Sequence, residues 1–273
     1  MLGGVVLALV AFVASQVVAS PRPRMRAMPA RRLSARDSAS IASQYKAQVS
    51  ARGAYYSAPR WLAGVHIARL EAEAEREISG RDAVPRLSRD SVQALIGAAR
   101  TGTYLEAMLA EDQDIVTRWH ERAEPIRVWV QPQSQEVGFT PELIVPTRRA
   151  FTAWNEVGLG VSFDLVDDST QADVHVTWSA RMPRERQIGT TFRMTSGAGW
   201  IAFAHVMLST SYDIYTVQNA ARHEAGHVLG LGHSPAMEDI MAAETEGRQY
   251  RLTDGDRATA LALYALPPGK LPR

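Results

Sequence analysis

The sequence predicts an α/β domain that follows a helical N-terminal region, and two observations carry this prediction. Between residues 61 and 122, apolar side chains recur at three- and four-residue spacing, as they do along one face of a helix. After Pro125, short segments of alternating apolar and polar residues are interleaved with segments of helical spacing. The chain has 273 residues, of which 46% are hydrophobic and 22% charged, and this composition is typical of a globular protein with a buried core.

The composition also excludes several kinds of chemistry. The sequence contains no cysteine, which excludes disulfides, thiolate metal sites and a cysteine nucleophile. Any metal ion must therefore be held by His, Asp or Glu. The formal net charge of +1 gives no support to nucleic-acid binding, so no nucleic-acid partner is expected.

The first segment, residues 1–20, is expected to be a signal peptide or a membrane anchor. Residues 2–19 are apolar apart from Ser15 and Gln16, and residues 18–20 form a small-residue pattern compatible with signal cleavage. We favour cleavage, and we expect a protein that is secreted or held in the cell envelope. Membrane association through an uncleaved anchor is the alternative. The lack of Lys and Arg before the apolar run, and the arginines that follow it, argue against simple translocation.

Two further segments precede the α/β region. Residues 21–58, rich in Arg, Ala and Ser, are expected to form a solvated linker; the alternative is a basic tail that contacts anionic lipid or nucleic acid. Residues 59–122 are expected to be helical, with helices that begin near residues 61, 91 and 103. This helical region is either a prodomain, which we favour, or a permanent domain.

The elements of the α/β region follow in order along the chain. A strand at 126–130 precedes a helix that Thr140 caps and that ends near Gly158, with Pro146 delaying its regular part until Thr147. Three more strands are expected at 161–166, 172–178 and 199–208, and two more helices at 216–230 and 253–264.

The run from His223 to His233 has the spacing of a metal site. His223 and His227 lie four residues apart, so on a helix they share one face and can bind one ion at Zn–N distances of about 2.0–2.1 Å. A straight helix would place His233 about 15 Å along its axis, too far to join them. Gly230 stands where the helix must end and the chain turn back, because glycine adopts positive φ freely. Three neutral imidazoles leave a position open for water, which predicts one catalytic Zn²⁺.

Glu224 directly follows the first of these histidines, so its carboxylate would project beside the metal rather than onto it. There it can take a proton from zinc-bound water, whose pKa the ion lowers, and pass that proton to a leaving amine. The pattern therefore predicts hydrolysis of a peptide bond with Glu224 as the general base. A His-Glu-x-x-His pattern alone is weak evidence, whereas the eleven-residue form with the glycine and the third histidine is specific.

The run HEAGHVLGLGHS at residues 223–234 resembles the metzincin zinc motif, and the serine after the third histidine is similar to the matrixin branch of matrix-metalloprotease type. Asp239-Ile240-Met241 resembles the methionine turn that the family places beneath its metal, with Met237 as the competing candidate. Residues 252–264 are similar to the family's C-terminal helix. The resemblance covers about residues 125–266, and it identifies residues 123–273 as a metzincin-like catalytic domain.

The resemblance implies a twisted, mostly parallel sheet of five strands with two helices, a zinc cleft, and a small C-terminal subdomain after Gly230. It also implies an edge strand that binds an extended peptide by strand addition. We place this strand within residues 200–208, with these candidate contacts: Trp200, Ile201, Ala202, Phe203 and Ala204.

Two features of matrixins cannot be recognised in this sequence. Latency in the family commonly uses a prodomain cysteine, which this chain lacks. The family also carries structural zinc and calcium, for which the chain offers no adequate further set of ligands. His175 and His205 are therefore expected to be ordinary strand histidines.

The leading functional hypothesis is an exported zinc endopeptidase that acts on proteins or peptides as a monomer. One alternative is a selective peptidase that processes a single surface protein. Another is a non-catalytic module for adhesion or binding, against which the intact Glu224 argues, because a protein without turnover needs no general base.

Overall fold

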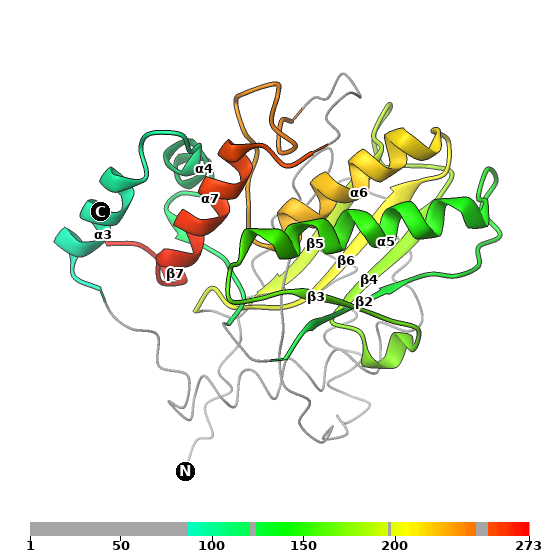
Figure 1. Ribbon diagram of the computed structural model, residues 1–273, viewed down its shortest axis with the longest axis horizontal. Helices are drawn as coiled ribbons and strands as arrows, with labels where there is room; N and C mark the ends of the chain where they lie inside the picture. Colours follow the sequence, from blue (N-terminus) through cyan, green and yellow to red (C-terminus); the bar gives the residue numbers. More distant parts are fainter. Residues whose placement is uncertain (1–86, 121–123, 196–197, 244–250, 273) are drawn as a thin grey trace, which may run out of the picture. The chain divides into compact units, whose positions relative to one another are not determined.

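The computed structural model describes residues 87–120, 124–195, 198–243 and 251–272 (Figure 1). Except for Pro183–Glu185, these residues belong to one compact unit. The predictions for residues 1–20 and 21–58, and for the first part of 59–122, lie outside the described residues. Among the described residues, no helix is both long enough and apolar enough to cross a membrane.

A five-stranded sheet forms the centre of this unit, in the order β3-β2-β4-β6-β5. Four of its strands are parallel, and β5 runs antiparallel to β6. The strands are β2 (Ile126–Val130), β3 (Phe163–Val166), β4 (Val174–Ser179), β5 (Gly189–Thr195) and β6 (Ile201–Ser209). The predicted five-stranded, mostly parallel sheet is thus confirmed.

Alternating burial is clearest in strand β2. In β2, Ile126, Val128 and Val130 are buried, while Arg127 and Trp129 between them are half-buried. The buried valines continue into the neighbouring strand, where Val128 is the register partner of Val174. One side of the sheet therefore contributes a continuous apolar surface to the core.

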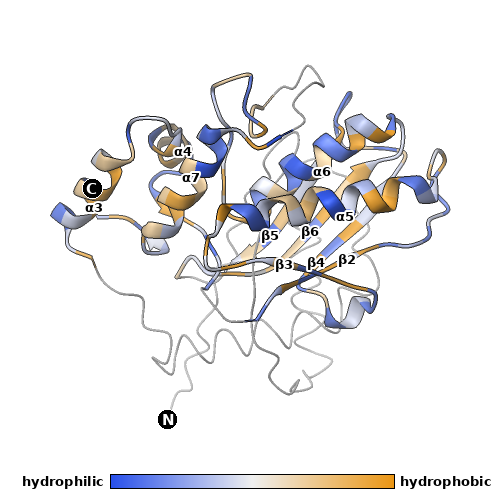
Figure 2. Ribbon diagram, viewed as in Figure 1, coloured by the Kyte–Doolittle hydropathy of each residue, from blue (hydrophilic) through white to orange (hydrophobic). Residues whose placement is uncertain are grey.

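Two helices pack across the sheet, as Figure 1 shows, namely α5 (Ile144–Thr152) and α6 (Ile214–Val228). Hydrophilic and hydrophobic residues alternate around them (Figure 2), as expected of helices with one buried face. A short 3₁₀ turn, η2 (Pro141–Leu143), leads into α5, and a second, η3 (Ala153–Val157), ends at Gly158, which has φ 74°. Pro146 does not delay α5, because it lies in the first turn, where a backbone N–H has no partner within the helix.

The C-terminal part contains α7 (Asp254–Ala265), whose Thr253 and Asp256 form a capping box. It packs with two helices from the N-terminal side, α3 (Arg89–Ala98) and α4 (Leu105–Glu111). A two-stranded sheet joins β1 (Ile115–Val116) to β7 (Gly269–Lys270). The expectation that residues 59–122 are helical is therefore wrong beyond Glu111: Gln113 and Asp114 have φ of 53° and 60°, which ends the helix, and an extended segment follows.

The placement of the edge strand at 200–208 is also wrong. Strand β6 lies inside the sheet, paired with β4 on one side and with β5 on the other. Its first residues are enclosed as well, because Ile201 N donates to the Arg118 carbonyl at 2.9 Å. An uninterrupted apolar run is typical of a strand buried on both faces, so Ile201, Phe203 and Ala204 are core residues. The terminal strand on this side of the sheet is β5.

Candidate metal centre

The metal site is built on the last turns of α6. Asp213 is the N-cap of this helix, and its carboxylate accepts from Tyr215 N at 2.9 Å and from Thr216 N at 3.1 Å. From Asn219 to Val228 every residue is buried, so this stretch runs through the core of the domain. His223 and His227, one turn apart, present their rings to the same side, with centroids 5.2 Å apart.

The third histidine arrives through a turn at Gly230. This residue has φ 98°, and a Cβ at its position would lie 1.9 Å from the Thr117 carbonyl oxygen. Only glycine fits both the backbone conformation and this close approach. The turn brings His233 Nε2 to 3.1 Å from His227 Nε2. One ligand atom from each of His223, His227 and His233 lies within 4.8 Å of the others, so the three predicted ligands converge.

Backbone carbonyls fix the tautomer of two of these rings. His223 Nδ1 donates to the Ile240 carbonyl, and His227 Nδ1 donates to the Leu231 carbonyl at 2.6 Å. Each Nε2 then carries a lone pair. Burial lowers the pKa of His223 and of His227 well below the ordinary value, which favours the neutral, ligating form.

A buried ring nitrogen also tests whether the site fits a metal. His223 Nε2 is inaccessible to solvent and has no hydrogen-bond partner in the described part of the chain. A buried polar atom without a partner is costly, and a metal ion would satisfy it. Three imidazoles and a remaining open position are the ligand set of a catalytic zinc site, so these residues fit Zn²⁺.

Glu224 lies between α6 and the terminal strand β5. Its side chain is fully buried, and Oε2 accepts a hydrogen bond from Thr191 Oγ1 at 2.5 Å. Oε1 has no hydrogen-bond partner among the described residues. A Cβ on Gly189 would lie 2.4 Å from Oε1, so glycine at this position leaves room for the carboxylate. Burial raises the pKa of Glu224, and the Thr191 hydroxyl acts against this increase.

Replacing Thr191 with valine is expected to lower kcat for peptide hydrolysis about tenfold, because a hydrogen bond to a charged group contributes about 1.5–3 kcal/mol. The buried carboxylate would lose the donor that holds Oε2. Thr191→Ser keeps the hydroxyl and is the matched control. Steady-state kinetics should show the loss in kcat rather than in KM; equal kcat values for the two variants would contradict a positioning role for Thr191.

Met241 packs against the helix that carries the first two histidines, and we call it the methionine floor. Met241 is fully buried, and a Cβ on Gly226 would lie 1.9 Å from its Sδ, so the side chain packs directly against α6. The Asp256 carboxylate accepts from Ile240 N at 3.0 Å and from Met241 N at 3.3 Å. Met237, the competing candidate, is 50% exposed and does not form the floor.

Arg193 belongs to this centre although its sequence pattern did not indicate it. Its guanidinium is buried and donates from NH1 to the His227 carbonyl at 3.1 Å, near the C-terminal end of α6. A cation there complements the helix dipole. Burial lowers the pKa of Arg193, whereas the nearby Asp112 and Tyr264 raise it. A buried arginine is unusual in a strand. The sequence alone does not show its function, because the contact with His227 becomes visible only in the fold.

His175 and His205 are register partners in β4 and β6. His205 Nε2 is 2.8 Å from Thr177 Oγ1, and burial lowers the pKa of His205 to about 4. His175 is packed between the rings of Trp129 and Phe203. In the described part of the chain, neither ring belongs to the group of side chains that could hold a metal ion.

The sheet is mostly parallel with one antiparallel terminal strand, and one helix presents two histidines and a glutamate beside a third histidine. Together these features define a zinc metalloendopeptidase domain. The family model described as Matrixin matches residues 119–265. The chain belongs to the matrixin family, which confirms the predicted resemblance.

The curated relatives agree with this assignment. The chain is 31% identical over 138 residues to Metalloendoproteinase 1-MMP of Arabidopsis thaliana, covering 44% of this chain and 37% of that protein. It is 29% identical over 139 residues to the Hatching enzyme of Paracentrotus lividus, covering 45% of this chain and 22% of that protein. It is 25% identical over 137 residues to Metalloendoproteinase 1 of Glycine max, covering 44% and 45%. The match spans less than half the length of each of these relatives.

Proposed function

We propose that the whole protein is an exported zinc-dependent endopeptidase that cleaves protein or peptide substrates. One observation carries the proposal: three histidines converge beside a fully buried glutamate, next to the terminal strand of the sheet. A purely structural zinc site would have its coordination completed by the protein and would not need a carboxylate at this position.

The catalytic step follows from where Glu224 is held. When bound, zinc would polarise the scissile carbonyl and acidify a water molecule. Glu224 Oε1, which has no partner among the described residues, accepts the proton of the attacking water and delivers it to the leaving nitrogen. Thr191 holds Oε2, so the carboxylate keeps one orientation through both transfers.

The substrate is proposed to pair with β5 rather than with β6. Strand β5 ends the sheet, so its outer edge can accept an extended peptide by strand addition. Gly189 and Thr191 of this strand contact Glu224, and Arg193 contacts the backbone of His227. A peptide bound along β5 would therefore lie beside both the general base and a zinc ligand.

Export and assembly state complete the proposal. The apolar residues 1–20 support a signal peptide or an anchor, and the protein is proposed to act outside the cell or in the cell envelope as a monomer. The substrate class is proposed to be unfolded or extended polypeptide, because strand addition requires an extended backbone.

Chelation of the full chain tests this function. Hydrolysis of unfolded casein is expected to stop when a zinc chelator is added and to return when zinc is restored, because the ion would polarise the scissile carbonyl and acidify the attacking water. Gel electrophoresis of the casein follows cleavage. A folded, zinc-loaded chain that leaves casein and a mixture of extended peptides uncut would refute general endopeptidase activity.

A further inference from the structure

We propose that residues 87–118, which directly precede the matrixin match at residues 119–265, are a permanent part of the catalytic unit and hold the zinc-binding turn in place. The mature enzyme would then retain them, and any removable prodomain would end before Leu87. The claim that the mature enzyme retains this segment rests on the proposed function. The claim that the segment holds the zinc-binding turn does not.

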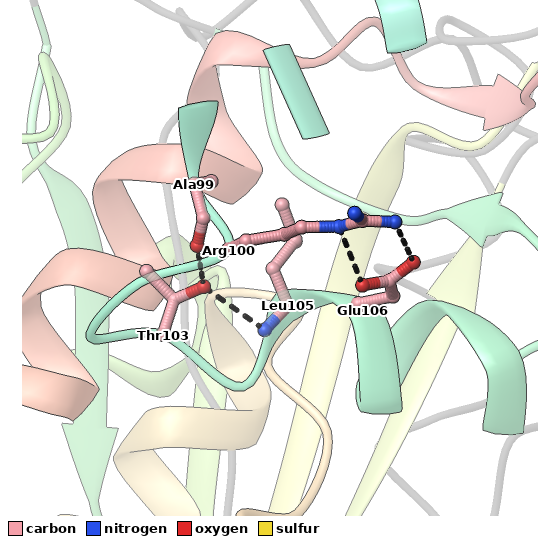
Figure 3. Close-up of polar contacts among 5 residues, drawn as sticks. All are labelled: Ala99, Arg100, Thr103, Leu105 and Glu106. Carbon is pink, nitrogen blue, oxygen red and sulfur yellow. Dashed lines mark hydrogen bonds and ion pairs between the residues drawn. The ribbon is translucent and has the colours of Figure 1, made fainter. Parts of the chain in front are cut away.

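The segment begins with a pair of helices, of which α3 has a side-chain cap. Ser88 caps α3 by accepting from Ser91 N at 3.1 Å. In the connection to α4, the Thr103 hydroxyl donates to the Ala99 carbonyl and accepts from Leu105 N at 3.4 Å (Figure 3). These hydrogen bonds fix the turn between the two helices, so α3 and α4 form one supersecondary unit.

An exposed ion pair crosses the same connection. The Arg100 guanidinium donates to both Glu106 carboxylate oxygens, at 3.3 and 3.4 Å (Figure 3). Both side chains are largely exposed, so this pair contributes little to stability. The stability of the segment must instead come from its buried side chains.

The apolar face of both helices is part of the core of the domain. Five of its side chains are at most 4% exposed, namely Val92, Ile96, Leu105, Met108 and Leu109. They belong to the same hydrophobic cluster as Leu263 of α7. Removing the segment would expose this cluster to water, which is not expected of a prodomain that dissociates.

Polar contacts join the same helices to α7. Tyr104 N donates to Thr259 Oγ1 at 3.0 Å, and Tyr104 OH donates to Asp256 Oδ1 at 3.3 Å. Asp256 is the residue that supports the backbone of Met241. The segment is therefore connected to the methionine floor through one intervening side chain.

The end of the segment pairs with β7 and forms an isolated bridge to Trp200, just before β6. Strand β1 pairs with β7, and Leu271 N donates to the Asp114 carbonyl at 2.9 Å. Arg118 N donates to the Gly199 carbonyl at 3.1 Å, and the Arg118 carbonyl accepts from Ile201 N. Cleavage before Trp119 followed by release would leave these backbone groups without partners.

The segment also touches the turn that carries His233. A Cβ on Gly232 would lie 2.6 Å from Met108 Cγ, and the Thr117 carbonyl lies against Gly230. Directly after the segment, Trp119 Nε1 donates to the carbonyl of Val228, the last residue of α6, at 3.0 Å. Because groups that orient metal ligands affect metal affinity, Met108 is proposed to be a positioning residue for the zinc site.

Limited trypsin digestion of the full chain tests whether the segment is permanent. The trypsin-resistant core that retains zinc is expected to begin no later than Asp90, as read by N-terminal sequencing, although Arg100 and Arg118 offer later cleavage sites. A stable core that retains zinc and begins at Thr101 or any later residue would overturn the proposal.

Zinc affinity of full-chain variants tests the positioning role. Met108→Ala is expected to weaken zinc binding about tenfold in competition with a chelator, whereas Met108→Leu, which preserves volume, should bind zinc nearly as the wild type does. Val137→Ala is the surface control, because Val137 is 83% exposed. Equal zinc affinity of a folded Met108→Ala chain and the wild type would refute the role. A chain that passes both tests but cleaves no peptide would contradict only the proposed function.

Discussion

Replacing Glu224 with glutamine in the full chain is expected to lower kcat/KM for peptide hydrolysis about 10²–10⁴-fold while zinc content stays unchanged. Glutamine has nearly the same shape and can still accept from Thr191, but it cannot accept the proton of the attacking water. His223 and His227 do not depend on the carboxylate for these hydrogen bonds, because each donates to a backbone carbonyl. The effect should therefore be confined to turnover.

Peptide cleavage and metal analysis of the same preparation measure both quantities. Glu238→Gln is the matched control, since Glu238 is exposed and close in sequence to the zinc ligands. If Glu224→Gln retained most of the wild-type activity, another group would have to act as the base, and the assignment of Glu224 would be wrong.

Replacing Asp256 with asparagine is expected to lower the free energy of unfolding by about 3 kcal/mol, because it breaks a buried network around a carboxylate. Both oxygens of the Asp256 side chain are in use: Oδ2 accepts from Ile240 N and Thr253 N, and Oδ1 accepts from Met241 N and Tyr104 OH. An amide supplies one acceptor oxygen and places an NH₂ group against the other donors.

Urea denaturation gives the change in stability, and chelator competition gives the change in zinc affinity, which should fall as well because the Met241 backbone is no longer held. Asp254→Asn is the control, since Asp254 is exposed in the first turn of the same helix. A loss of stability no larger than that of Asp254→Asn would mean that the network does not hold the methionine turn.

The metal site could be predicted from the sequence because its geometry is local. Two histidines one helical turn apart, a glycine where the helix must end, and a third histidine after it are all fixed by spacing within eleven residues. The family match confirmed the class of protein that this spacing indicated.

The sequence did not predict strand β5, and the reason is connected with the contacts that this strand makes at the metal centre. Its residues Thr191 and Arg193 face the core, where an ordinary strand would carry apolar side chains, and they contact Glu224 and His227 there. Local rules of patterning are often broken at functional sites. The more hydrophobic β6 was assigned the edge position in its place, although a continuous apolar run is typical of a strand in the interior.

The role of the N-terminal helices could not be predicted, because it depends on contacts between residues far apart in sequence. Helical periodicity identifies an apolar face but not the partner that covers it. Tyr104 and Thr259 are separated by 155 residues, as are Ile115 and its register partner Lys270. Only the folded chain shows that this segment and α7 share one core.

The three contacts between β5 and α6 have a mechanical consequence. Gly189 and Thr191 meet Glu224, and Arg193 holds the backbone of His227, so the proposed peptide-binding strand and the zinc-binding helix form a single rigid wall. This wall cannot widen to accommodate a bulkier peptide without displacing the general base or a zinc ligand. We therefore expect differences in side-chain preference between peptides to depend on residues outside this wall.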